Sequence, residues 1–156
     1  MKHIISVLVE NKFGVLARIS GLFSARGFNI DSLAVGETEE PAVSRMTIVV
    51  RGDDRTLEQV KKQLNKLIDV ISVSDFVKKE HIDMELLLFK VNANKNTKPK
   101  ILKVLSKFDT NIIKSSNEVV IVDMVGNQED IASLLEQLKE FGIREMVRTG
   151  RIAMAL

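Results

Sequence analysis

Two hydrophobic periods alternate along this chain, and their order occurs twice. Residues 2–10 are rich in Ile and Val and place Ile5, Val7 and Val9 on one face, which predicts a strand. Residues 14–26 carry apolar side chains at helical spacing, and Gly27 follows as a helix stop. Residues 29–38 and 43–51 are two further predicted strands, a helix begins after Asp53 or Asp54, and residues 69–77 form a fourth strand. The predicted order is βαββαβ.

The same order restarts after the polar segment at 78–83. A predicted strand at 84–93 leads into a helix with Pro99 near its start, and residues 110–116 and 118–126 are two more strands. A second helix ends at Gly142, and residues 143–156 form a last strand region interrupted at Gly150. The fold class is therefore α+β, with two ferredoxin-like βαββαβ units in tandem. The expected domains are residues 1–78 and 84–156, joined by a linker at 79–83.

Units of this size bury little surface and leave unpaired strands at the sheet edges. Both properties favour association with another copy, so we expect a homodimer or a higher oligomer.

Composition excludes much chemistry. The 156 residues include no Cys and two His, His3 and His81, and the net charge is +2. Thiolate chemistry is excluded, and no catalytic group, metal site or cofactor is predicted for this chain. The charge gives no reason to expect nucleic acid. No apolar run is long enough for a membrane span or a secretory signal, so we expect a cytoplasmic protein.

The stretch ENKFGVLARISGLF, residues 10–23, carries the main functional signal. It is a strand-to-helix corner, where the first helical N–H groups lack partners and carry partial positive charge. Gly14 has no Cβ to keep a ligand from these groups. An anion suits such a corner, but the missing P-loop Lys and further glycines argue against polyphosphate. A small carboxylate is the better candidate.

Two asparagines extend this interpretation. Asn11 closes the first strand and Asn29 opens the second, and we expect their corners to lie toward one end of the sheet. A side-chain amide both donates and accepts, so it suits a zwitterion. Val15, Leu16 and Ile30 offer an aliphatic wall, which favours a free aliphatic amino acid as the ligand. The equally weighted alternative is structural: Asn11 caps the helix and Asn29 is a turn residue after Gly27.

The same residues carry a family resemblance. The run ENKFGVLARISGLFSARGFNIDSL, followed by ETEEPAVSRMTIVV and QVKKQLNKLIDVISV, resembles the regulatory (small) subunits of acetohydroxyacid synthase, also called acetolactate synthase. The similarity covers residues 2–78, which it identifies as an ACT domain. The second half is similar to the family's C-terminal domain by length and pattern. Many ACT domains have Pro before the corner glycine, where this chain has Phe13.

The resemblance implies a non-catalytic subunit. Its partner would be a catalytic (large) subunit that carries thiamine diphosphate, Mg²⁺ and FAD. This chain would activate that partner and confer feedback inhibition by valine or a related branched-chain amino acid, leucine or isoleucine included. The effector would lie between two ACT domains of a dimer. The residues implied are Asn11, Gly14, Val15 and Leu16 of one chain, and Asn29 and Ile30 of the other.

Other functions compete with this one. A free-standing ACT-type amino-acid sensor for another enzyme or a transcription factor would keep the ligand site. An RNA-binding RRM shares the element order, but strands 2–10 and 43–51 contain no aromatic residue for base stacking. An independent enzyme lacks a convergent acid–base pair.

Two charged segments stay open to interpretation. Six lysines and no acid lie between Leu86 and Phe108, either as a docking face for an acidic partner or nucleic acid, or as a solvated helix face. Asp31, Glu37, Glu39 and Glu40 form an acidic patch, but no ligand register predicts a divalent cation there.

Overall fold

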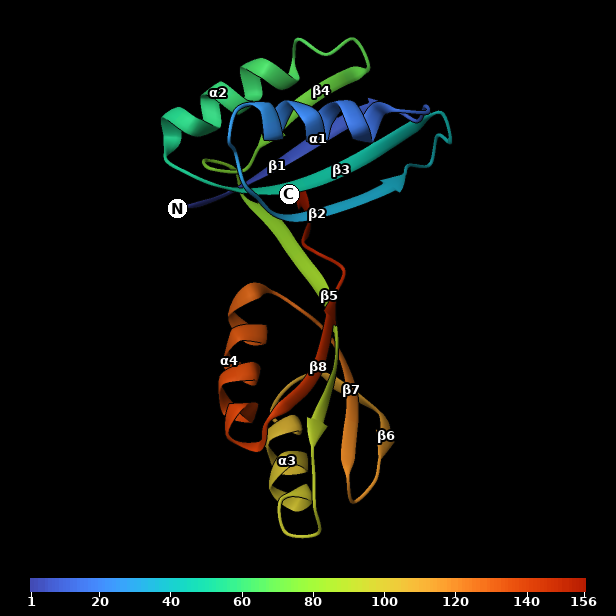
Figure 1. Ribbon diagram of the computed structural model, residues 1–156, viewed down its shortest axis with the longest axis vertical. Helices are drawn as coiled ribbons and strands as arrows, with labels where there is room; N and C mark the ends of the chain where they lie inside the picture. The colour runs from blue at the N-terminus through green and yellow to red at the C-terminus, as the bar shows by residue number, and fades with distance from the viewer. The chain divides into compact units, whose positions relative to one another are not determined.

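The computed structural model describes all 156 residues, and the chain forms two compact units. The first unit comprises Met1–Asp83 together with Arg151–Leu156, and the second comprises Met84–Gly150. In Figure 1 residues 1–83 of the first unit run from blue to green and its last segment, residues 151–156, is red, whereas the second unit runs from yellow-green to red-orange.

The first unit has the predicted βαββαβ order. Its elements are β1 (Lys2–Glu10), α1 (Val15–Ala25), β2 (Ile30–Glu37), β3 (Val43–Arg51), α2 (Asp54–Leu64) and β4 (Val70–Asp75). The sheet order is β2-β3-β1-β4, and every neighbouring pair is antiparallel. The tandem ferredoxin-like prediction is confirmed for this half, and β2 and β4 are the strands at the sheet edges.

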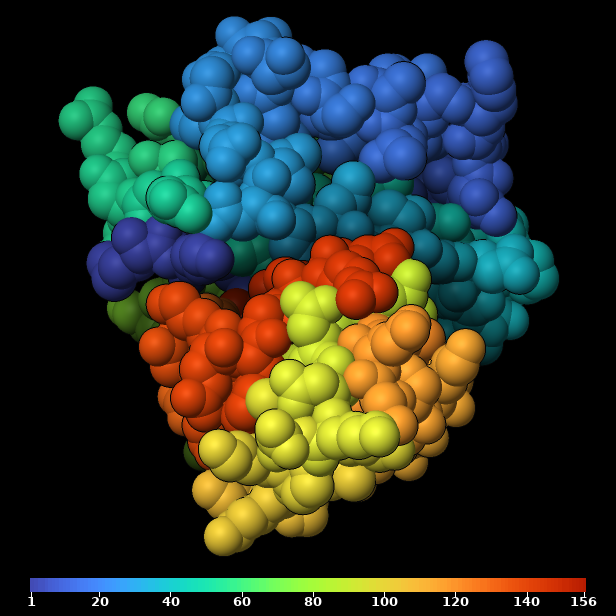
Figure 2. Space-filling view, turned by 60° about the horizontal axis from the view of Figure 1, so that its bottom comes forward, coloured from blue at the N-terminus to red at the C-terminus, as the bar shows by residue number.

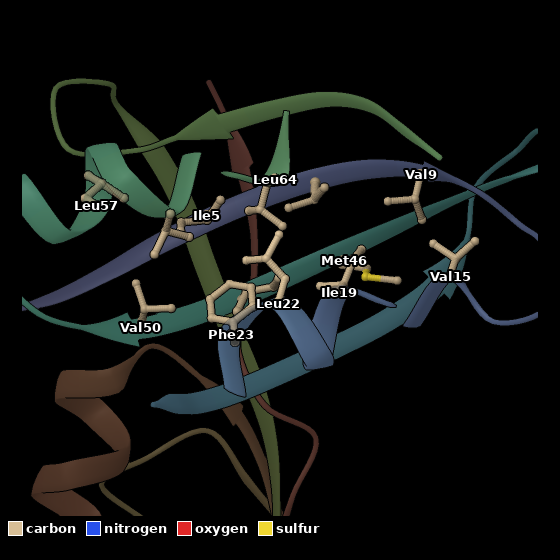
Figure 3. Packing of buried hydrophobic residues seen from close by; sticks show 13 residues of the cluster. Ile5, Val9, Val15, Ile19, Leu22, Phe23, Met46, Val50, Leu57 and Leu64 are labelled. Carbon is tan, nitrogen blue, oxygen red and sulfur yellow. The ribbon is translucent and has the colours of Figure 1, made fainter. Parts of the chain in front are cut away.

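One face of this sheet forms the core under α1 and α2 (Figure 1). The alternating residues Ile5, Val7 and Val9 are buried there, as the sequence predicts. In Figure 3, Val9 and Val15 meet at one end of this core, whereas Val50 and Leu57 lie toward the other end. The helical start at Asp53 is also as predicted, because its carboxylate accepts the Thr56 N–H at 2.7 Å.

The second unit repeats the order. Its elements are β5 (His81–Asn92, which begins in the first unit), α3 (Lys98–Leu105), β6 (Thr110–Ser115), β7 (Val119–Gly126), α4 (Gln128–Leu138), a 3₁₀ turn (Lys139–Phe141) and β8 (Ile143–Arg148). The sheet order β6-β7-β5-β8 matches that of the first unit. Leu87, Phe89 and Val91 form the centre of its core, under α3 and α4. None of the helices is long and apolar enough to cross a bilayer.

The ends of the second unit differ from the expected boundaries. His81–Asp83 begin β5 instead of forming a linker, and Arg151–Leu156 belong to the first unit, not to a domain at 84–156. The chain turns at Gly150, where φ is 85°, and continues as β9 (Ile152–Ala155). Ala153 is buried in a cluster with Ile4, Val49 and Phe76. Strand periodicity does not predict that this segment packs on the sheet of the first unit.

Candidate functional site

The corner between β1 and α1 leaves backbone donors exposed at a helix N-terminus. Gly14 is the N-cap residue, in the left-handed region with φ 82°, and no side chain caps the helix. The first regular bond runs from Arg18 N–H to the Gly14 carbonyl at 3.0 Å, and Val15 N–H makes a long bond of 3.4 Å to Lys12. The amides of Gly14 and Leu16 donate to no group of the chain. A carboxylate can accept from such donors.

Asn11 stands beside this corner and is held by the β2–β3 turn. Its N–H donates to Ala42 O at 2.7 Å, and its side-chain Nδ2 donates to Pro41 O at 2.8 Å. The alternative in which Asn11 caps the helix is wrong, because the cap is Gly14. The bond to Pro41 fixes the side-chain amide and leaves its oxygen as an acceptor for an ammonium group.

A guanidinium adds positive charge to the corner. Arg18 Nε donates to Asp69 Oδ2 at 2.7 Å, and Nη2 lies 2.7 Å from the same oxygen. The third nitrogen, Nη1, lies 3.1 Å from the position of a Cβ built at Gly14. Arg18 is not among the site residues predicted from the sequence. Its place four residues after Gly14 on a helix was the available signal, because residues i and i+4 share a face.

The three predicted aliphatic residues have different surroundings. The Val15 side chain is 3% exposed within the core, so only its backbone faces the corner. Leu16 is 45% exposed on the outer surface of α1, beside the fully exposed Phe13. Ile30 is partly buried against the core from β2. Leu16 is therefore the aliphatic side chain that the corner exposes to solvent. The helix α1 that carries it belongs to the blue surface in Figure 2.

Asn29 lies at the opposite end of the sheet from Asn11. Ile30 pairs with Val50, which pairs with His3 at the start of β1, whereas Glu10 at the end of β1 pairs with Val43. Seven residues along a strand separate these ends by about 23 Å. The expectation that both corners lie toward one end is wrong within a single chain, because β1 and β2 run parallel with β3 between them. Asn29 Nδ2 instead donates to Asp31 Oδ1 at 3.2 Å.

The acidic patch around Asp31 and the lysine-rich segment between Leu86 and Phe108 differ in how their side chains are paired. Asp31 is paired with Lys2 and Arg51, and the hydrogen bond from Arg51 holds the pKa of its carboxyl below the usual value. The chain contains no group of three His, Cys, Asp or Glu side chains placed to hold a metal ion. In the lysine-rich segment Lys90 pairs with Glu145, and Lys107 donates to Gln137 at 3.4 Å. The other four lysines of that segment form no ion pair: Lys95, Lys98, Lys100 and Lys103.

Comparison with known families covers both units. A family model described as "AHAS small subunit-like ACT domain" matches residues 5–72. A second, described as "Small subunit of acetolactate synthase", matches residues 84–156.

Individual proteins are similar along nearly the whole chain. The probable acetolactate synthase small subunit of Archaeoglobus fulgidus is 46% identical over 99% of this chain and 96% of its own length. The probable acetolactate synthase small subunit of Methanothermobacter thermautotrophicus is 48% identical over 98% of this chain and 92% of its own length. A crystal structure of the acetolactate synthase small subunit from Thermotoga maritima superposes with a TM-score of 0.89 at 36% identity, covering 100% of this chain and 98% of that one.

Proposed function

Because this chain belongs to the family of acetolactate synthase small subunits, with an ACT domain as its first unit, we propose that it is the regulatory subunit that activates a catalytic subunit and makes it sensitive to valine. The effector is valine or a related branched-chain amino acid. The chemistry belongs to the catalytic partner, which would carry thiamine diphosphate, Mg²⁺ and FAD, none of them held by this chain.

The observation that carries the proposal is the open N-terminus of α1. Unused amides at Gly14 and Leu16 offer two donors to a carboxylate, and Arg18 adds a half-exposed positive charge. The fixed Asn11 amide has an oxygen for the ammonium group of an amino acid, and Leu16 offers an aliphatic surface for its side chain. The set fits a small zwitterion with an aliphatic side chain.

A second copy completes the site. β2 is an edge strand, and its end, Glu37, lies at the Asn11 end of the sheet because Glu37 and Val9 share the partner Ser44. Antiparallel pairing of β2 with the β2 of another copy would bring that copy's Asn29 and Ile30 toward this corner. We therefore assign Asn11, Gly14, Val15 and Leu16 of one copy, and Asn29 and Ile30 of the other, to one effector site.

Such a site explains regulation. A ligand shifts an equilibrium only when it binds one arrangement better than another. Effector held by both copies favours the arrangement that closes the site. Selectivity among valine, leucine and isoleucine should be modest, because one methylene is worth about 1–3 kcal/mol.

Reconstitution tests the proposal. The purified chain is added to its acetolactate synthase catalytic subunit, and acetolactate formation is measured with and without valine. The expected result is a rise in activity on mixing and inhibition of the mixture by valine. No gain on mixing, together with a valine-induced rise in the melting temperature of the isolated chain, would instead identify a free-standing amino-acid sensor.

A further inference from the structure

The corner that we assign to the effector offers it little apolar surface. Leu16 presents an aliphatic side chain, but Val15 contributes only backbone, because its side chain lies in the core (Figure 3). Ile30, which the second copy supplies, is partly buried against that copy's own core. A branched aliphatic side chain held by these residues alone would keep much of its surface in water. The site therefore lacks an apolar cover.

Phe13 is the apolar side chain that is free to supply this cover. It is fully exposed, so its ring packs against no other part of the chain. Its Cα lies about 3.8 Å from that of Gly14, whose amide we assign to the carboxylate of the effector. Rotation about its side-chain bonds can bring the ring over the corner without breaking any existing contact.

The backbone at this point does not require a phenylalanine. Val15 N–H bonds to the Lys12 carbonyl at 3.4 Å, which closes a four-residue turn. Gly14 has φ 82° and ψ −6°, whereas Phe13 has no positive φ, so the turn is of type II. Proline is common at the position of Phe13 in such turns, and the Phe13 amide donates to no group of the chain. A large aromatic side chain here therefore serves neither the turn nor the core.

We propose that the Phe13 ring closes over the side chain of the bound effector and sets the preference for an aliphatic amino acid. This inference rests on the effector site proposed above. A phenylalanine ring brings about 150–250 Å² of rigid surface, far more than Leu16 exposes at the corner. Closure also removes water from the bonds between the effector's carboxylate and the amides, and electrostatic attraction is stronger where water is excluded.

The preference follows from the cost of removing water. An alkyl group loses water against a phenyl ring without penalty, whereas a hydroxyl group loses water and gains no hydrogen bond. Valine and threonine differ by one hydroxyl at nearly equal shape, and an apolar pocket separates such a pair by up to about a hundredfold. The ratio of valine affinity to threonine affinity therefore reports the contact with Phe13.

Substitution of Phe13 tests its role in the full chain. Phe13→Ala should weaken valine binding about tenfold, which corresponds to about half of the burial of a phenylalanine side chain. Threonine binding should weaken less, so the valine-to-threonine ratio should fall severalfold. Phe13→Leu keeps an apolar side chain and is the matched control, with most of the ratio retained. Isothermal titration measures both ligands, and an unchanged ratio in Phe13→Ala would overturn the proposal.

The melting temperature separates this role from a structural one. Because the Phe13 side chain is fully exposed, Phe13→Ala and the wild-type chain should melt at the same temperature without ligand. Valine should raise the melting temperature of the wild-type chain more than that of Phe13→Ala, because tighter binding stabilises the native state more. Equal increases would contradict a contact between the ring and valine.

The absence of tryptophan allows the ring itself to be observed. Phe13→Trp introduces a single indole, and Ile68→Trp is the matched control. Ile68 is 94% exposed and precedes Asp69, the ion-pair partner of Arg18, so it lies beside the corner but outside the proposed contact. Valine should shift the emission of Phe13→Trp to shorter wavelengths and protect it from acrylamide, and it should leave Ile68→Trp unchanged. A Phe13→Trp chain that binds valine without this change would overturn the proposal.

The same signal identifies any other occupant of the corner. A shift that appears on concentrating Phe13→Trp without valine, or only when the catalytic subunit is added, would overturn the proposal in favour of a docking contact. Valine inhibition of the reconstituted wild-type enzyme is recorded in parallel. Retained inhibition together with an unchanged valine-to-threonine ratio in Phe13→Ala refutes this inference alone. A wild-type chain that neither binds valine nor confers inhibition removes the effector site and this inference together.

Discussion

Replacement of Gly14 by a charged residue should separate effector binding from folding. Gly14→Asp places a carboxylate beside the amides that we assign to the effector's own carboxylate. Gly14→Asn is the matched control, because the two side chains have the same size and both tolerate left-handed backbone. The built Cβ meets only the end of the Arg18 side chain, at 3.1 Å from Nη1, and this flexible end can shift.

The magnitude follows from Coulomb's law. Two carboxylates about 5 Å apart repel by about 1 to 3 kcal/mol for effective dielectric constants between 80 and 20, since the corner is partly exposed. Valine affinity should thus be roughly five- to a hundredfold weaker in Gly14→Asp than in Gly14→Asn. The backbone strain at φ 82° is about 1–2 kcal/mol and common to both variants, so their melting temperatures should agree.

Isothermal titration of valine into each variant, together with valine inhibition of the reconstituted enzyme, measures this difference. Equal valine affinity in the two variants would refute the placement of the effector's carboxylate. A Gly14→Asp variant that no longer activates the catalytic subunit would show that the corner serves partner binding.

Three further predictions concern other groups. Arg18→Gln should weaken valine binding severalfold while activation of the catalytic subunit is retained, as measured by the same titrations; unchanged affinity would remove Arg18 from the site. Asn127 caps α4 by accepting the Asp130 N–H at 2.9 Å, so Asn127→Ala should lower the free energy of unfolding by about 1 kcal/mol and Asn127→Asp should restore it, as measured by urea denaturation. The hydrogen bond from Lys61 lowers the pKa of Asp75, so the pair stabilises the fold above the ordinary Asp pKa, and this contribution is lost as the pH falls through the lowered value. Asp75→Asn should therefore reduce stability at pH 7 but make little difference near pH 2; an equal loss at both values would contradict the linkage.

The fold was largely predictable because its signals are local. The run of Ile and Val in β1, the helical stripe of α1 and the stop at Gly27 each depend on neighbouring residues, and all of these elements form where expected. The return of Arg151–Leu156 to the first unit was not predictable, because it depends on Ala153 contacting Ile4 and Val49 far away in sequence. Strand periodicity identifies which face of a strand is apolar, but not which distant segment of the chain packs against that face.

The site was predictable only in part. Gly14 and its helix N-terminus follow from a strand-to-helix corner, and the unused amides are where that corner implies. The burial of Val15 and the pairing of Arg18 with Asp69 depend on tertiary packing. The separation of Asn29 from Asn11 depends on sheet order, because β3 inserts between β1 and β2. These are properties of strand arrangement that no local pattern contains.

Complementation between two binding-deficient variants tests most directly the claim that two copies share one effector site. Asn11→Ala and Asn29→Ala are purified separately, mixed, dissociated and reassociated, and valine binding is titrated. In either homodimer every site has one defect. In a mixed dimer one site has both defects and the other has none, so random assortment restores wild-type affinity at about a quarter of all sites. Binding by the mixture that equals the average of the two separate variants would contradict a site shared between copies.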